Sequence, residues 1–232
     1  MAKDVIMLAI TRRCGSTMLR SVLQQNNNIV VENEVFRPFI NLSIDKKKEA
    51  YTSTVQNIIL RIDELGEKTC YLYTVSAEDI INLENFNLIN LILPTKILFL
   101  YRENILEQYS SNELAKIFNS FNDTKEIKKL KSSKRLFFNN LLFNNYIFNM
   151  RRAIMTIINF IKKHKINYQV YEYNSINKNL KKIFNFIGLE YKNEVPKTIK
   201  SETRNLKDIF INFSNIKTDY KIDLTRAFQD IL

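Results

Sequence analysis

Apolar residues occur along this chain in short blocks, separated by longer stretches with helical spacing. The blocks at residues 4–10 and 96–101 are nearly continuous in apolar side chains, which is typical of strands buried on both faces of a parallel sheet. Residues 68–75 alternate and are rich in aromatic and β-branched side chains, so they also predict a strand. Two shorter blocks, at 29–31 and 168–171, complete the predicted strands.

Helical periodicity fills the intervals between these strands. The predicted helices are residues 18–25, 51–65, 78–86, 104–119, 133–163 and 176–187. The longest carries one apolar stripe that we expect to pack in the core and not to bind a cofactor: Phe143, Ile147, Met150, Ile154, Ile158 and Ile161. The alternation of strands and helices predicts an α/β fold, a three-layer sandwich with a mostly parallel central sheet.

The composition supports one globular domain over residues 1–232, because 45% of the chain is hydrophobic and 25% is charged. The two cysteines, Cys14 and Cys70, exclude a disulfide scaffold and favour a reducing compartment. Residues 1–10 are too short and too acidic for a signal peptide, and no run approaches the roughly 20 apolar residues of a membrane span. We therefore expect a cytoplasmic protein without a membrane span, and the sequence leaves its oligomeric state open.

The net charge of +11 at pH 7 favours anionic partners, such as nucleic acids, phosphorylated cofactors, acidic glycans or anionic membrane surfaces. The densest basic stretches are residues 46–48 and 125–135. Neither alternates with aromatic residues or matches a nucleic-acid-binding module. We interpret both stretches as solvated faces and expect no nucleic-acid partner.

The turn after the first predicted strand, residues 11–17, holds one of only three glycines. In α/β proteins the loop at this position often cradles phosphate. Gly15 allows a tight turn there, and Ser16 and Thr17 supply hydroxyl groups at the start of a helix. Arg13 adds a positive charge suited to bidentate contact. An anion site is predicted, but the Gly-Lys-Ser/Thr of a Walker A loop is absent, which disfavours a magnesium-dependent nucleoside triphosphatase.

The segment Arg13-Cys14-Gly15-Ser16-Thr17-x-Leu19 resembles the 5′-phosphosulfate loop of the sulfotransferases that use 3′-phosphoadenosine 5′-phosphosulfate (PAPS). A second signature follows a later strand, where residues 97–104 resemble the family's strand ending in arginine, here Arg102, with Ser110 further on. In that family the arginine and the serine hold the 3′-phosphate. The spacing runs from a strand end onto the first turns of a helix, so both side chains can converge on one anion. The resemblance implies a P-loop-like nucleotide-binding architecture.

Three weaker similarities extend the resemblance discontinuously over most of the chain. Residues 28–36 resemble the segment where many bacterial and carbohydrate sulfotransferases carry Glu-x-Phe. Residues 168–172 and 183–189 resemble their strand-Tyr-Glu and Phe-x-Gly-Leu block. Residues 200–212 resemble a C-terminal loop that closes over the nucleotide in bacterial glycan sulfotransferases.

The resemblance implies transfer of the sulfuryl group of PAPS to a hydroxyl acceptor, a sugar, lipid or small metabolite, with release of adenosine 3′,5′-bisphosphate and without a metal. The residues that it assigns to the co-substrate are Arg13, Cys14, Gly15, Ser16, Thr17, Arg102, Ser110, Lys200, Thr203 and Arg204. Arg13 is also expected to be catalytic, because it would contact the 5′-phosphosulfate. Two positions depart from the family: Cys14 stands where Ser or Thr is usual, and Ser201 where the subgroup often has glutamine.

Glu34 is expected to be the general base for the acceptor hydroxyl, on the resemblance and on its place after the first α/β unit, and Glu32 is the competing choice. His164, the only histidine, is interpreted as a solvated helix cap because lysines surround it. Cys14 is interpreted as a small residue that fits a tight loop. A thiol activated by Arg13 and the helix N-terminus is the alternative. No cluster of histidine, cysteine and carboxylate residues suggests a metal site.

Two other classes of function stay open at the level of sequence. A degenerate P-loop protein related to kinases predicts ATP binding and a magnesium requirement. A basic module for polyanions predicts salt-dependent binding that is insensitive to Arg102. The sulfotransferase hypothesis instead predicts selective binding of adenosine 3′,5′-bisphosphate without metal.

Overall fold

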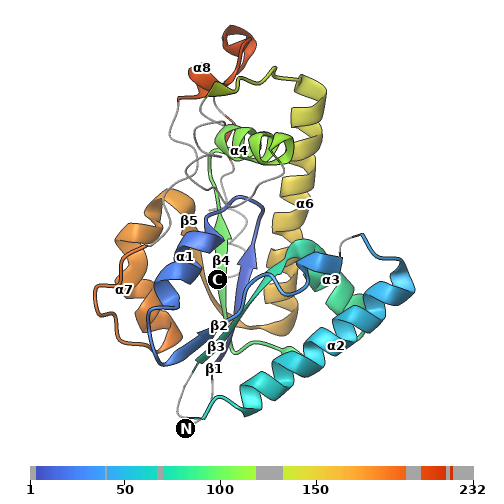
Figure 1. The fold of residues 1–232 in the computed structure, drawn as a ribbon, viewed down its shortest axis with the longest axis vertical. Helices are drawn as coiled ribbons and strands as arrows, with labels where there is room; N and C mark the ends of the chain where they lie inside the picture. The colour runs from blue at the N-terminus through green and yellow to red at the C-terminus, as the bar shows by residue number, and fades with distance from the viewer. Residues whose placement is uncertain are drawn as a thin grey trace.

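The computed structural model of the chain describes residues 4–39, 41–66, 70–118, 133–196, 205–217 and 220–221. Within these residues, one sheet has the strand order β2-β3-β1-β4-β5, and every neighbouring pair is parallel. The strands are β1 (Asp4–Ile10), β2 (Ile29–Val31), β3 (Cys70–Ser76), β4 (Lys96–Tyr101) and β5 (Asn167–Glu172). The five predicted strands are therefore confirmed (Figure 1).

Helices cover both faces of the sheet (Figure 1). One face is covered by α1 (Ser16–Leu23) and α7 (Ile176–Ile187). The other is covered by α2 (Ile44–Asp63), α3 (Ala77–Asn85) and α6 (Asn140–His164). The remaining helices of the described residues are α4 (Ile105–Ile117) and the short α8 (Leu206–Ile209), which Figure 1 shows beyond the carboxyl ends of the strands. This arrangement confirms the predicted three-layer α/β sandwich.

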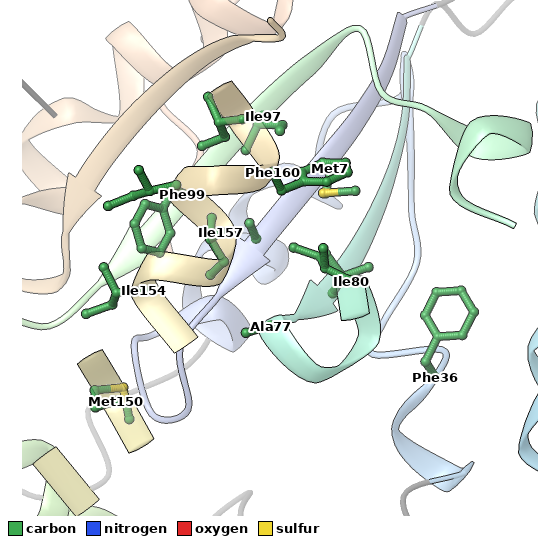
Figure 2. Packing of buried hydrophobic residues seen from close by; sticks show 14 of the residues in the cluster. Met7, Phe36, Ala77, Ile80, Ile97, Phe99, Met150, Ile154, Ile157 and Phe160 are labelled. Carbon is green, nitrogen blue, oxygen red and sulfur yellow. The ribbon is translucent and has the colours of Figure 1, made fainter. Parts of the chain in front are cut away.

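The two faces of the sheet carry separate cores because successive side chains of β1 point in opposite directions. Ile6 and Leu8 pack under α1 and α7, whereas Met7 belongs to the opposite cluster. Figure 2 shows that opposite cluster, in which Met7 packs with Phe99 of β4 and Phe160 of α6. Full burial of each such side chain stabilises the fold by about 1.5–3 kcal/mol. The central strands are therefore rigid supports for the loops that follow them.

The stripe predicted along α6 lies in the core. Five of its six members are buried and Ile147 is half-buried; the buried ones are Phe143, Met150, Ile154, Ile158 and Ile161. None of the helices in the described part of the chain is long and apolar enough to cross a membrane.

Two helix starts differ from the sequence prediction. α2 begins at Ile44 and not at residue 51, because residues 44–50 are mostly exposed and polar and so show no apolar period. α6 begins at Asn140 and not at residue 133. Asn139 caps it by accepting a hydrogen bond from the Leu142 N–H (3.1 Å), and Leu136 before it forms a β-bridge with Phe210. The apolar residues before 140 therefore belong to an extended segment.

Candidate functional site

The loops that carry the candidate residues leave the middle of the sheet at one edge. β1 pairs with β4 up to Ile10 and Leu100, and the Thr11 N–H donates to the Leu100 carbonyl (3.4 Å). Residues 11–17 and Arg102 therefore follow adjacent carboxyl ends of parallel strands. Ligand sites of open α/β sheets form at this position.

Left-handed backbone shapes the loop after β1. φ is +62° at Arg13 and +89° at Gly15. Gly15 is the N-cap of α1, and no side chain caps this helix end. Successive N–H groups of such a turn, together with the positive end of the helix dipole, favour an anion. The loop therefore has the backbone form that the sequence predicted for an anion site.

Helix α4 holds this loop in place. The buried side-chain amide of Gln108 donates to Thr11 Oγ1 (3.2 Å) and to the Arg12 carbonyl. Arg13 Nε donates to Ser111 Oγ (3.0 Å). The helix that follows Arg102 thus fixes the loop that follows β1, and Ser111, next to Ser110, makes the direct contact with Arg13.

Tyr173 joins the two loops. It begins the short turn after β5, and the edge of its ring lies against Gly15, where an added Cβ would stand 2.4 Å from Tyr173 Cδ2. The guanidinium carbon of Arg102 lies 4.7 Å from the centroid of the same ring, a cation–π contact. Any side chain at position 15 would collide with this ring, so glycine is required there by packing as well as by its positive φ.

Arg102 is buried, and its side chain is directed at Glu107. Its Nη2 donates to Glu107 Oε2 (2.5 Å), while its buried Nε has no hydrogen-bond partner among the described residues. Ser110 is also buried, and its hydroxyl donates to the Glu107 main-chain carbonyl (2.9 Å). Both residues that the sequence assigned to the 3′-phosphate therefore bond to the same residue.

Two tyrosines show that the arginines share one electrostatic environment. Burial raises the pKa of Tyr173, and the positive charges of Arg102 and Arg13 oppose this rise. Burial also raises the pKa of Tyr146 on α6, against the charges of Arg102, Arg12 and Arg13. The Tyr146 hydroxyl is buried and has no hydrogen-bond partner among the described residues. The loop after β1 and the end of β4 thus form one positively charged site.

Glu34 lies after β2 and is linked to α1 by a second buried arginine, Arg20. Arg20 Nη1 is 3.6 Å from Glu34 Oε1, and the guanidinium also donates to Thr74 Oγ1 (3.4 Å) and Thr17 Oγ1 (3.5 Å). Burial lowers the pKa of Arg20, and the charge of Glu34 opposes this. Arg37 pairs with Glu34 on its other oxygen (3.4 Å). The structure thus connects Glu34 to the hydroxyl of Thr17 through one guanidinium.

The competing base, Glu32, pairs with Arg61 of α2. Its main-chain N–H and carbonyl are taken up by β3: the N–H donates to the Leu72 carbonyl (2.7 Å), and the carbonyl accepts from Thr74 Oγ1 (3.3 Å). Glu32 therefore extends the β2–β3 pairing, whereas Glu34 lies beyond it and reaches α1.

Cys14 is buried, and this burial raises the pKa of its thiol to about 12. The thiol is therefore neutral near pH 7, which favours the interpretation of Cys14 as a residue that fits the loop. No group of three or more histidine, cysteine, aspartate or glutamate side chains that could hold a metal occurs within the residues that the structure describes.

His164 ends α6 as predicted, but its side chain is only 13% exposed. The ring packs on Phe160 with centroids 4.6 Å apart, and Nε2 lies 3.7 Å from Glu84 Oε1. The interpretation of His164 as a solvated cap is therefore wrong. Because β5 begins at Asn167, His164 lies at the amino edge of the sheet, opposite the candidate site.

Comparison with solved structures finds sulfotransferase domains. The chain superimposes on the sulfotransferase domain of the Synechococcus PCC 7002 olefin synthase with a TM-score of 0.50 and 14% identity, covering 98% of this chain and 87% of that one. The sulfotransferase domain of the curacin biosynthetic pathway gives a TM-score of 0.51, again at 14% identity, with coverages of 99% and 90%. No family model and no curated protein sequence matches the chain. The chain therefore has the fold of these sulfotransferase domains.

Sequence reasoning missed four residues at this site: Arg20, Glu107, Ser111 and Tyr173. Arg20 had a detectable signal, because a charged residue lies beside Leu19 and Val22 on the buried face of α1. Tyr173 directly follows the strand-Tyr-Glu block but has no motif of its own. The expected C-terminal contributors Lys200, Thr203 and Arg204, with Ser201, lie outside the described residues.

Proposed function

We propose that the chain is a sulfotransferase that moves the sulfuryl group of PAPS to a hydroxyl acceptor. The observation that carries this proposal is the convergence of the loop 11–17 with Arg102 around Tyr173, at the carboxyl edge of a parallel sheet. The likeness of the fold to sulfotransferase domains supports the same conclusion.

The donor set suits a nucleotide with an anion at each end. The glycine turn and the start of α1 supply main-chain N–H groups for the 5′-phosphosulfate, and Arg13 adds a guanidinium. Arg102 and Ser110 suit the 3′-phosphate, because a buried guanidinium with an unpartnered Nε has a hydrogen bond left to donate. Lys200, Thr203 and Arg204 are proposed as further contacts from the C-terminal loop.

Sulfuryl transfer, like phosphoryl transfer, builds charge on the oxygen that bridges to the leaving group in a loose in-line transition state. Arg13 and the N–H groups of the loop are positioned to stabilise that charge on the adenosine bisphosphate that leaves. Glu34 is proposed to accept the proton of the acceptor hydroxyl. Its ion pairs with Arg20 and Arg37 hold the carboxylate near the loop in its ionised form. These residues complete the reaction without a metal.

The proposed acceptor is a hydroxyl of a sugar, lipid or small metabolite. Incubation of the protein with PAPS and fractionated metabolites, followed by mass spectrometry, is expected to reveal products that have gained one SO₃ group. Each such product should be absent when PAPS is omitted.

The donor is tested by binding of three nucleotides: adenosine 3′,5′-bisphosphate, AMP and ATP. Thermal-shift and calorimetric titration without metal should show preference for the bisphosphate. Arg102→Ala should weaken bisphosphate binding roughly 10- to 150-fold, because a charged hydrogen bond contributes about 1.5–3 kcal/mol. Arg151→Ala, which removes an exposed arginine of α6, is the matched control and should bind like the parent. Equal affinity for the bisphosphate and AMP would overturn the proposal, and magnesium-dependent ATP binding would favour a kinase-like protein.

A further inference from the structure

The residue at the centre of the proposed 3′-phosphate site is an acid. Arg102 bonds to the carboxylate of Glu107, and Ser110 bonds to the main chain of the same residue. A carboxylate thus lies where the proposed function requires a phosphate. This arrangement concerns which anion Arg102 holds, so it rests on the proposed function and goes beyond it.

The position of Glu107 suits an anion for reasons independent of Arg102. Glu107 lies in the first turn of α4, where the helix dipole favours negative charge. Asn104, the N-cap, accepts from the Glu107 N–H (3.0 Å) and donates its side-chain amide to Glu107 Oε1 (3.2 Å). One carboxylate oxygen is therefore held by the helix cap and the other by Arg102.

The two partners of this ion pair differ in their access to water. The side chain of Arg102 is 7% exposed and that of Glu107 is 34% exposed. If the pair opens, Glu107 can turn into solvent at little cost, whereas Arg102 is left as a buried charge that requires another anion. The ring of Tyr173 lies against the guanidinium and restricts its movement. The pair therefore opens by departure of Glu107.

We propose that Glu107 is a built-in competitor for Arg102, which the 3′-phosphate of the nucleotide displaces. Displacement reduces the net gain from the 3′-phosphate, since one charged hydrogen bond is exchanged for another. With a 3′-hydroxyl nucleotide, Glu107 stays on Arg102 and no exchange occurs. Glu107 therefore sets the margin by which this site prefers a 3′-phosphate to a 3′-hydroxyl, and it weakens the hold on the bisphosphate product.

The chain offers a matched control next to Arg102. Glu103 is also acidic, but it is more exposed and pairs with Lys221 at 3.6 Å. Glu103→Gln makes the same change in net charge without freeing Arg102. Surface pairs of this kind contribute little to binding energetics.

The test measures the dissociation constants of AMP and adenosine 3′,5′-bisphosphate by calorimetry on the full chain. In Glu107→Gln the ratio of the two constants should rise about tenfold in favour of the bisphosphate, as expected for release of one charged hydrogen bond. Glu107→Ala should show a gain of the same sign, and Glu103→Gln should keep the parent ratio. In the double variant Arg102→Ala/Glu107→Gln the gain should vanish, because the two residues act through one interaction.

Two outcomes separate this inference from the proposed function. If the parent prefers the bisphosphate and the ratio is unchanged or smaller in both folded Glu107 variants, Glu107 is no competitor, and the donor assignment stands. If neither the parent nor any variant prefers the bisphosphate to AMP, the proposed function fails and this inference fails with it.

Discussion

Arg20 and Arg102 are equally buried, and each pairs with a glutamate that is about one-third exposed, yet their surroundings differ. Arg20 lies on α1 with two threonine hydroxyls as further partners, and these come from α1 itself and from β3. Arg102 lies at a strand end, with one short ion pair and an aromatic ring beside it.

This difference separates a guanidinium that holds the site together from one that is available to a ligand. The partners of Arg20 all belong to elements that surround the loop, so its charge organises the position of Glu34. The partner of Arg102 is a side chain that can leave. The same residue type, equally buried, therefore serves two purposes according to whether its counter-ion is fixed.

The largest effect is expected at the counter-ion of Arg20. Glu34→Gln should lower the rate of sulfuryl transfer at least about 100-fold, because it removes the proposed general base, while bisphosphate affinity stays unchanged. Steady-state kinetics with a hydroxyl acceptor, together with calorimetry, measure the two effects separately. Glu32→Gln is the paired variant. A loss of rate in Glu32→Gln alone would move the base to Glu32.

The two arginines should differ next in their contribution to folding. Arg20→Met should lower the free energy of unfolding by about 3 kcal/mol, because Glu34, Thr17 and Thr74 lose a shared buried partner. Arg102→Met should lower it by about 1 kcal/mol, since Glu107 can turn into water. Urea titrations of both variants give these values. Equal losses, or a larger loss in Arg102→Met, would contradict the division of roles.

The smallest effect is expected at Cys14, whose thiol lies on the Arg20 side of the loop. With a pKa of about 12, roughly one molecule in ten thousand carries the thiolate at pH 8. A thiol alkylating reagent should therefore leave Cys14 unmodified in the folded protein and modify it after unfolding in urea, as peptide mass spectrometry will show. Rapid alkylation of the folded protein would mean that this side of the loop is open.

The sheet could be predicted because β1 and β4 are continuous apolar blocks, whose pattern depends only on local sequence. The start of α2 could not, since its exposed first turns are polar and are held by few buried contacts. The extended segment around Leu136 resembled a helix because its apolar residues pack on Phe210, a partner far along the chain. Periodicity reports burial on one side and does not identify what is packed there.

The site followed the same rule. Gly15 and Arg13 were predicted because a loop after a first strand has a local signature. The pairing of Arg20 with Thr74 joins residues 54 positions apart, and no spacing in the sequence encodes it. Glu107 was within reach of Arg102 in sequence, yet which carboxylate turns toward a guanidinium depends on the helix cap at Asn104.

The stack of Gly15, Tyr173 and Arg102 has a consequence for the order of folding. Its members come from the first strand loop, from the end of β4 and from the turn after β5, so it contains some of the longest loop closures in the chain. Contacts of high sequence separation form late, because their closure entropy must be overcome first. Since β5 is an edge strand, its docking completes the sheet and the anion site in one step. Competence to bind nucleotide should therefore arrive last during refolding and be lost first, by detachment of β5 and α7, while the central strands stay folded.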